Sequence, residues 1–305
     1  MSDNIENLEG LEDFPLTNAM DVAILMHRDA HFGGRFDLML EYYAKGGKGV
    51  NPDFDIDRII LLSEMEKKIN QNLAALLLSG PDAERVAQAK EAYKKLRDLY
   101  ETEKPYNKIP LLIADLILSE SEEPIEEIDE IVKEKGLAVK PLLELIRSED
   151  FHDPLFPGYG LAPNYAVTCL GLIGDKRAIV TLFESIGSGD FFDEDMSLAA
   201  LHAIGDPAKA FLMKVLHGKP LNIDNEKAAI ALINFKEDPE VSAACLNMLR
   251  DPEVRRQTLL ATYLVLACEG LTDEGQRKDF MALMEDNLTP QSLQKDMKIL
   301  VKTWE

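Results

Sequence analysis

The chain has 305 residues, of which 46% are apolar and 29% charged, and its formal net charge is −22. This length and apolar fraction allow two ordinary domains or one elongated array, and they exclude a chain that is disordered throughout. Because the acidic field repels phosphates and anionic lipids, we expect no nucleic acid partner and no membrane partner.

The sequence carries no signal for a membrane or an oxidising compartment. No run approaches the roughly 18 to 20 apolar residues of a spanning helix, and the start MSDNIENLEG lacks a basic region followed by an apolar one. We therefore expect a cytoplasmic protein. Cys169, Cys245 and Cys268 are far apart and lie among apolar residues. They predict reduced core thiols, without a disulfide framework or a metal site.

Charge divides the chain into three parts. Residues 1–15 hold five acids and no base, which predicts an acidic disordered tail. Residues 16–105 hold 13 bases and 15 acids and are expected to form a helical N-terminal module. Residues 106–305 hold 20 bases and 35 acids, a balance of −15, and are expected to form a repeat domain with a C-terminal cap. That field serves solubility and also favours a basic partner.

In the N-terminal module, breaks at Gly, Pro and Asn residues predict four helices, at 17–30, 35–45, 56–79 and 82–103. The last two are expected to form an antiparallel hairpin. No segment alternates apolar and polar residues over a useful length, so we expect no sheet.

After Pro110 the apolar pattern becomes repetitive. The first helix of each unit carries an apolar pair, and successive pairs are 31 residues apart: Leu170 with Ile173, Leu201 with Ile204, and Leu232 with Phe235. A fourth unit follows from Asp251, residues 289–305 form a terminal cap, and residues 107–149 contain degenerate earlier units. Such two-helix units cannot bury their apolar faces alone. The pattern therefore predicts an all-α fold, an α-α superhelix preceded by the N-terminal module.

The turns inside the units contain Gly-Asp steps, Gly174-Asp175 and Gly205-Asp206. Glycine just past a helix end can adopt the left-handed conformation, and aspartate can cap the next helix by accepting from its free amides. All four are interpreted as structural caps.

The stretches GLIGDKRAI and HAIGDPAKA resemble the HEAT-like repeats found in phycobilisome lyases and many bacterial proteins. The resemblance covers about residues 107–305 and is strongest from 161 to 250. It implies an all-helical superhelix that usually binds other macromolecules, and it implies no particular activity.

Some enzymes share this architecture, and their signatures are missing here. Deoxyhypusine hydroxylases bind iron with repeated His-Glu pairs, but no histidine of this chain is followed by Glu. HEAT-like DNA glycosylases need a basic groove, whereas residues 106–305 are acidic. For bilin lyases, the chain shows no separate pigment-attachment signal. Because these enzyme signatures are missing, we expect the protein to bind no cofactor.

Two stretches of the N-terminal module invite a chemical interpretation. HRDAH places His27 and His31 on one helix face, a spacing that can bind a transition metal, but it has no Glu after the first His and no matching second motif. AKGGKGVNPD has glycines and lysines but not the phosphate-loop pattern, and is interpreted as a flexible connector. The acidic run from Ser119 is interpreted as the solvated start of a helix.

The connections between units are long and rich in aromatic and acidic residues. DFHDPLFPGYGLAP starts at Asp150 and GSGDFFDED at Gly187, and in a stacked array they would lie side by side. Their aromatic and acidic residues are either a partner-binding edge or small cores under the loops. The partner-binding candidates are Phe151, Phe156, Tyr159, Asp190, Phe191, Phe192, Asp193, Glu194 and Asp195.

These observations favour a non-catalytic scaffold or adaptor that binds a protein partner, with preference for a basic one. One alternative is an enzyme with a metal or small-molecule site at His27 and His31. A further alternative is a structural subunit of a homo-oligomer.

Overall fold

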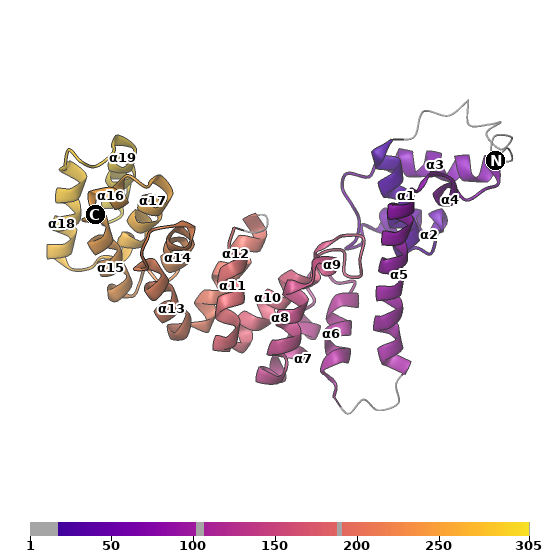
Figure 1. Cartoon of the computed structure of the whole chain (residues 1–305), viewed down its shortest axis with the longest axis horizontal. Helices are drawn as coiled ribbons and strands as arrows, with labels where there is room; N and C mark the ends of the chain where they lie inside the picture. The colour runs from indigo at the N-terminus through magenta and orange to yellow at the C-terminus, as the bar shows by residue number, and fades with distance from the viewer. Residues whose placement is uncertain (1–17, 102–106, 188–190, 305) are drawn as a thin grey trace. The chain divides into compact units, whose positions relative to one another are not determined.

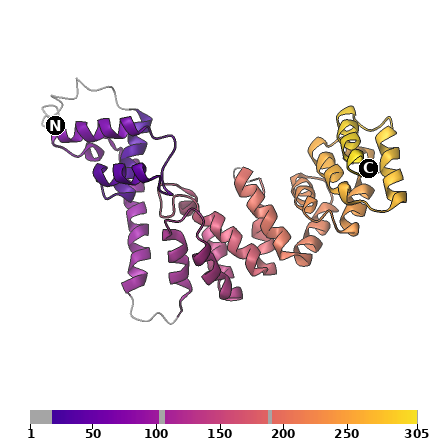
Figure 2. The ribbon, with the colours of Figure 1, turned by 180° about the vertical axis from the view of Figure 1, so that it is seen from behind.

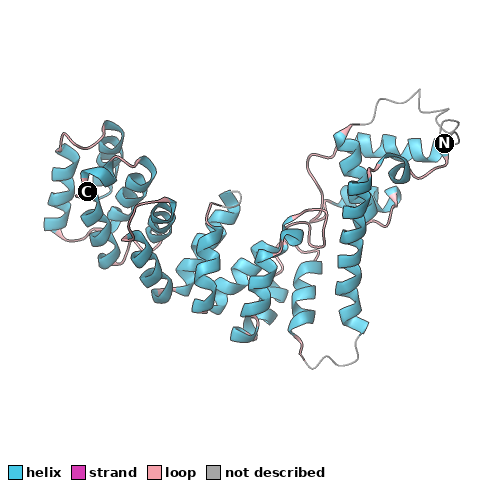
Figure 3. Cartoon of the chain, in the orientation of Figure 1, coloured by secondary structure: helices cyan, strands magenta, loops and turns pink. Residues whose placement is uncertain are grey.

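In the computed structural model, the structure describes residues 18–101, 107–187 and 191–304, and within them it contains helices and no strand (Figure 1; Figure 3). The predicted all-α fold class is therefore confirmed. None of the described helices is long and apolar enough to cross a membrane. The predicted acidic tail, residues 1–15, lies outside the described residues.

The first half of the chain forms short helices and one long one. They are α1 (Ala19–His31), α2 (Phe36–Lys45), α3 (Ile56–Ile69), α4 (Leu73–Leu77), α5 (Gly80–Glu101), α6 (Ile109–Leu118), α7 (Ile125–Lys133), α8 (Val139–Arg147) and α9 (Glu149–His152). Several of these helices have a side-chain N-cap. The Asn18 side chain accepts a hydrogen bond from the Asp21 amide at the start of α1, and the Asp55 side chain accepts one from the Asp57 amide at the start of α3.

The prediction of one helix at 56–79 is wrong for the second half of that range. α3 ends at Ile69 because Asn70 adopts the left-handed conformation, with a φ of 50°. Asn72 then caps the separate helix α4 by accepting from the Ala75 amide. The expected hairpin partner also changes, since α5 packs against α1 and α6. α5 and α6 run side by side when viewed from either side (Figure 1; Figure 2).

The chain divides into two compact units. The first contains Met1–Ile131 and Glu144–Tyr165, and the second contains Val132–Leu143 and Ala166–Glu305. The sequence-based boundary at 105/106 falls between α5 and α6, which pack against each other in the first unit. A core of α1 to α4 residues, including Ile24, Met39 and Leu62, organises this unit.

The second half of the chain forms the repeated helix pairs. They are α10 (Ala162–Ile173), α11 (Ile179–Ser185), α12 (Phe191–Ile204), α13 (Asp206–Leu216), α14 (Ile223–Ile233), α15 (Pro239–Leu249), α16 (Pro252–Arg255), α17 (Thr258–Ala267), α18 (Glu274–Glu285) and α19 (Gln291–Val301). Helix α11 packs against α12, α13 against α14, α14 against α17, and α17 against α19. Helices that lie close in sequence thus pack against one another in the second unit, as an α-α superhelix requires.

The repeat register is visible in the burial of its key residues. Leu170, Leu201 and Leu232, which are 31 residues apart in sequence, are each 0% exposed. The unit contains the three cysteines as buried free thiols. Burial raises the pKa of Cys169 and of Cys245 to about 12, so these thiols stay protonated at neutral pH.

The four predicted caps have different outcomes. Gly174 has a φ of 70° and its amide donates to the Leu170 carbonyl, and Asp175 accepts from the Arg177 amide at 2.9 Å. Gly205 also has a positive φ, 78°, but its ψ of −138° lies outside the left-handed helical region. Asp206, however, is not a cap. Gly205 itself occupies the N-cap, so Asp206 becomes the first helical residue and its side chain, 92% exposed, points to solvent and pairs with Lys209.

Candidate functional site

The predicted histidine pair lies together on α1 in the first unit, with ring centroids 4.4 Å apart. Both ring nitrogens of His31 are used: Nε2 is 3.0 Å from the Pro154 carbonyl oxygen, and Nδ1 is 2.7 Å from the Tyr93 hydroxyl. Because a carbonyl only accepts, Nε2 carries the proton and Tyr93 donates to Nδ1. His31 therefore has no free lone pair for a metal ion.

Burial controls the protonation of both rings. It lowers the pKa of His27 to about 3, with a further contribution from His31, and it lowers the pKa of His31 to about 4 against the opposing effects of Pro154 and Asp153. Both imidazoles are neutral at neutral pH. Within the described residues, no group of three or more His, Cys, Asp and Glu side chains is arranged to hold a metal ion.

The first aromatic connection packs onto this histidine pair. Tyr159 adopts a φ of 57° and lies over His31, with ring centroids 4.6 Å apart. Phe156 is 4% exposed and belongs to a small core with Met26 and Ala89. Phe156 is therefore a core residue, which corrects its assignment as a partner-binding candidate, and Phe151 is half-buried.

A network of tyrosine contacts extends from this cluster. The Tyr159 ring also lies beside the Tyr42 ring, with centroids 6.3 Å apart. Tyr42 in turn donates to a Glu120 carboxylate oxygen at 2.7 Å and accepts from the Gly49 amide at 3.1 Å. The network joins two stretches, HRDAH and DFHDPLFPGYG, that the sequence showed as unrelated.

The glycine-lysine connector is packed rather than flexible, contrary to expectation. A Cβ on Gly49 would lie 2.2 Å from the Tyr159 ring, so only glycine allows this approach. Lys48 donates to the Ser119 carbonyl at 2.8 Å and lies 4.6 Å from the centre of the Tyr165 ring. Burial lowers the pKa of Lys48 to about 8, although Glu120 and Glu127 oppose this shift.

The second aromatic connection is shorter than predicted. Helix α12 begins at Phe191, so Phe191, Phe192, Asp193, Glu194 and Asp195 are helical and do not belong to a loop. Asp190 lies outside the described residues, as do the side chains of residues 191–193. Glu194 is half-buried and Asp195 exposed. The two connections belong to different compact units, and a joint partner-binding edge stays a prediction.

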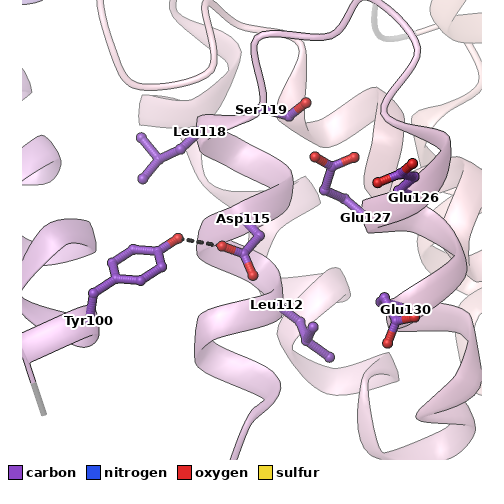
Figure 4. Close-up of a pocket in the computed structure, with 8 residues that line it drawn as sticks. All are labelled: Tyr100, Leu112, Asp115, Leu118, Ser119, Glu126, Glu127 and Glu130. Atoms are coloured by element: carbon purple, nitrogen blue, oxygen red, sulfur yellow. Dashed lines mark hydrogen bonds between the residues drawn. The ribbon is translucent and has the colours of Figure 1, made fainter.

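An acidic groove of about 400 Å³ lies between α5, α6 and α7 in the first unit (Figure 4). Its apolar lining residues are Leu112 and Leu118 of α6. Its described lining residues include four carboxylates and no basic side chain: Asp115, Glu126, Glu127 and Glu130. Figure 4 shows Asp115 on the α6 side and the three glutamates on the α7 side.

The carboxylates of the groove are only partly satisfied by the protein. Asp115 accepts a hydrogen bond of 2.6 Å from the Tyr100 hydroxyl, and both residues line the groove. Among the described residues, Asp115, Glu126 and Glu127 form no direct ion pair, although Glu127 interacts electrostatically with Lys48. This arrangement attracts an ammonium or guanidinium group and offers apolar contacts to its aliphatic stem.

Sequence reasoning identified part of the lining of this groove. The acidic run from Ser119 was visible, and α7 does begin with the acids Glu126 and Glu127, as expected for the solvated start of a helix. Asp115 and Tyr100 lie in different helices, and nothing in the sequence pattern indicated that they meet this run.

Comparisons of the chain with protein-family models, with curated proteins and with solved structures found no significant match. The resemblance to HEAT-like repeats therefore stays a prediction.

Proposed function

We propose that this chain is a non-catalytic scaffold or adaptor built on HEAT-like repeats, which binds a basic segment of a partner protein in the groove between α5, α6 and α7. The observation that carries the proposal is the combination of four carboxylates with two leucines in the lining of one groove. Lysine and arginine side chains match it, since each combines a charged end with an aliphatic stem.

The electrostatics of the chain support the same partner class. The net charge of −22 draws a basic segment toward the protein from any side, but it gives no preference for a particular surface. The groove supplies that preference because its four carboxylates line one pocket together with Leu112 and Leu118. We expect the attraction to weaken as salt rises, on the scale of a Debye length of about 8 Å at physiological ionic strength.

The experiment compares two triple variants of the full chain that change the net charge equally. The groove variant carries Asp115→Asn, Glu126→Gln and Glu127→Gln. The control carries Glu237→Gln, Glu240→Gln and Glu274→Gln, which are exposed acids of the second unit. A fluorescent peptide of alternating lysine and leucine serves as the probe, and its binding is followed by anisotropy at two salt concentrations.

We expect the groove variant to bind the probe roughly tenfold more weakly, the sum of several partly exposed charge pairs. The control variant should change binding less than about twofold, because it alters only the screened long-range field. Equal weakening in both variants would mean that the overall charge, and not the groove, attracts the peptide. Circular dichroism of each variant excludes unfolding as the cause.

The geometry does not favour the alternative of a metal enzyme at His27 and His31, because both nitrogens of His31 are hydrogen-bonded within the protein. The homo-oligomer alternative stays a prediction, and a mass measurement in solution tests it.

A further inference from the structure

A pocket of about 600 Å³ is lined by residues of α1, α2 and α5 in the first unit. Small-molecule sites in proteins typically have about 300 to 1,000 Å³, so this volume suits one. The described lining residues carry three basic side chains, Arg35, Lys90 and Arg97, and one carboxylate, Asp29. The chain as a whole is acidic, but residues 16–105, which contain this lining, hold 13 bases and 15 acids. The pocket is therefore a locally basic site in an acidic protein.

Arg97 carries a positive charge that is not paired with a carboxylate. Among the described residues, it donates only to the backbone carbonyl of Tyr93, from Nε at 3.4 Å, and it forms no ion pair. Arg35, by contrast, donates to the Asp37 carboxylate through both Nε and Nη2. Because a guanidinium stays charged and matches the oxygens of a carboxylate or phosphate, Arg97 is the group of this lining best suited to hold an anion.

Lys90 adds a second cation on the same side of α5. Lys90, Tyr93 and Arg97 are three and seven residues apart, so they share one face of the helix. The Lys90 Nζ lies 3.8 Å from a carboxylate oxygen of Asp29, which is too far for a hydrogen bond. Asp29 accepts two closer hydrogen bonds from Arg28, of 2.8 and 2.6 Å. The ammonium of Lys90 therefore keeps its donors for a ligand.

Aromatic and apolar side chains form much of the remaining wall. His31, Phe32 and Tyr93 line the pocket as half-buried rings, and Leu38 is 39% exposed. The His31 ring meets Tyr93 edge-on, with centroids 5.7 Å apart, and its centroid lies 6.3 Å from that of Phe32. Because both nitrogens of His31 are hydrogen-bonded within the protein, this residue offers a ligand only its ring. The pocket thus combines an unpaired guanidinium with an aromatic wall.

We propose that this pocket binds a small molecule that carries a carboxylate or phosphate group on an aromatic body. Arg97 holds the anionic group through charge-assisted hydrogen bonds, and Lys90 adds to the attraction. The aromatic body lies against Phe32, Tyr93 and Leu38. The pocket shares no lining residue with the acidic groove, so the inference does not rest on the function proposed for that groove.

Benzoate and benzyl alcohol test the charge requirement because they have nearly the same shape and differ in the anionic group. Phenyl phosphate presents the other anion on the same ring, and acetate presents a carboxylate without a ring. Each compound is titrated into the full-length protein, and binding is followed by ligand-detected NMR. The titrations are repeated with the pocket variant, Lys90→Gln with Arg97→Gln, and with a control, Lys94→Gln with Lys95→Gln. The control removes two positive charges from exposed residues of α5 that do not line the pocket.

We expect benzoate, phenyl phosphate or both to bind the native protein about fivefold more tightly than benzyl alcohol, the effect of partly exposed charge-assisted contacts. A preference for only one of these anions identifies which group the site takes. Acetate should bind about fivefold more weakly than benzoate or not at all, because it lacks the ring. In the pocket variant the preference for the anion should fall below about twofold, whereas the control should keep it.

Three results would overturn the proposal. The first is equal affinity of the native protein for benzyl alcohol and for both aromatic anions, or no saturable binding of any compound. The second is an equal loss of preference in the pocket variant and the control, which would assign the effect to overall charge. The third is acetate binding as tightly as benzoate, which would mean that the site takes any small anion. Circular dichroism checks the fold of each variant, and if the double pocket variant fails to fold, the exposed single change Arg97→Gln decides by the same criterion.

Discussion

The Tyr93 hydroxyl lies 2.7 Å from Nδ1 of His31, and this contact joins α5 to α1 across 62 residues of sequence. Together with the Pro154 carbonyl on Nε2, it holds the His31 ring in one tautomer and one orientation. The ring also supports Tyr159, whose centroid lies 4.6 Å away. A single imidazole thus connects two helices and the connection that follows α9.

Removing the Tyr93 hydroxyl tests how much this contact stabilises the first unit. Tyr93→Phe leaves the Nδ1 acceptor of His31 without a donor, which costs roughly 1 to 3 kcal/mol. Hydrogen exchange of the α1 and α5 amides, read by mass spectrometry, should report the lower free energy of opening. The matched control is Tyr263→Phe in the second unit, whose hydroxyl makes no hydrogen bond to a described residue; it should change local opening by less than about 0.5 kcal/mol. Unchanged protection of α1 in Tyr93→Phe would contradict the role assigned to the contact.

The two histidines predict a specific acid sensitivity. Their pKa values in the folded protein are about 3 and about 4, below an ordinary value of about 6.5 in the unfolded chain. The unfolded state therefore binds protons first, and the free energy of unfolding falls as the pH drops below about 6.5, by up to about 1.4 kcal/mol per pH unit for each ring. Urea unfolding between pH 7 and pH 5, followed by circular dichroism, measures this slope. In His27→Phe the slope should decrease by about one proton, and an unchanged slope would show that His27 is not held neutral.

A comparison of Asp238 with Asp206 distinguishes the stability contributed by a helix cap from that contributed by a surface charge. Asp238 accepts from the Glu240 amide at the start of α15, and Asp206 makes no such bond at α13, although both pair with Lys209. Asp238→Ala should lower the free energy of unfolding by roughly 0.5 to 2 kcal/mol, the usual cost of losing a cap. Asp206→Ala should cost less than about 0.5 kcal/mol, because an exposed ion pair contributes little. Equal losses in urea unfolding would mean that Lys209, and not the cap, accounts for the effect.

Close helix packing in the second unit depends on Gly171. A Cβ at this position would lie 2.8 Å from the Ala200 Cα, a backbone atom of α12 that cannot move without shifting the helix. Gly171→Ala should therefore destabilise the second unit by roughly 1 to 3 kcal/mol through overpacking. Gly80→Ala is the control, because a Cβ there meets no atom within 4 Å, and it should be neutral or slightly stabilising. Hydrogen exchange of α10 and α12 gives the measurement, and native protection in Gly171→Ala would show that the helices separate without cost.

Two of the errors in the sequence-based helix boundaries have a common physical origin. The chain forms two helices where one was predicted at 56–79, because Asn70 adopts a left-handed conformation. The apolar periodicity of this segment does not reveal that conformation. Asp206 was misassigned because Gly205 took the cap position itself. In each case a single residue in a rare backbone conformation decided where a helix begins or ends, and spacing alone does not show which residue will adopt it.

The sequence by itself determined the all-α fold and the register of the helix pairs, because apolar periodicity and its 31-residue spacing are local properties of the chain, confirmed by the burial of Leu170, Leu201 and Leu232. It also placed His27 and His31 on one helix face. Only the tertiary structure decided what surrounds them. Tyr93 and Pro154 form hydrogen bonds with both ring nitrogens of His31, and Asp115 meets the acids of α7 in one groove. These contacts join residues far apart in sequence, and their partners follow from how helices pack, which no local pattern encodes.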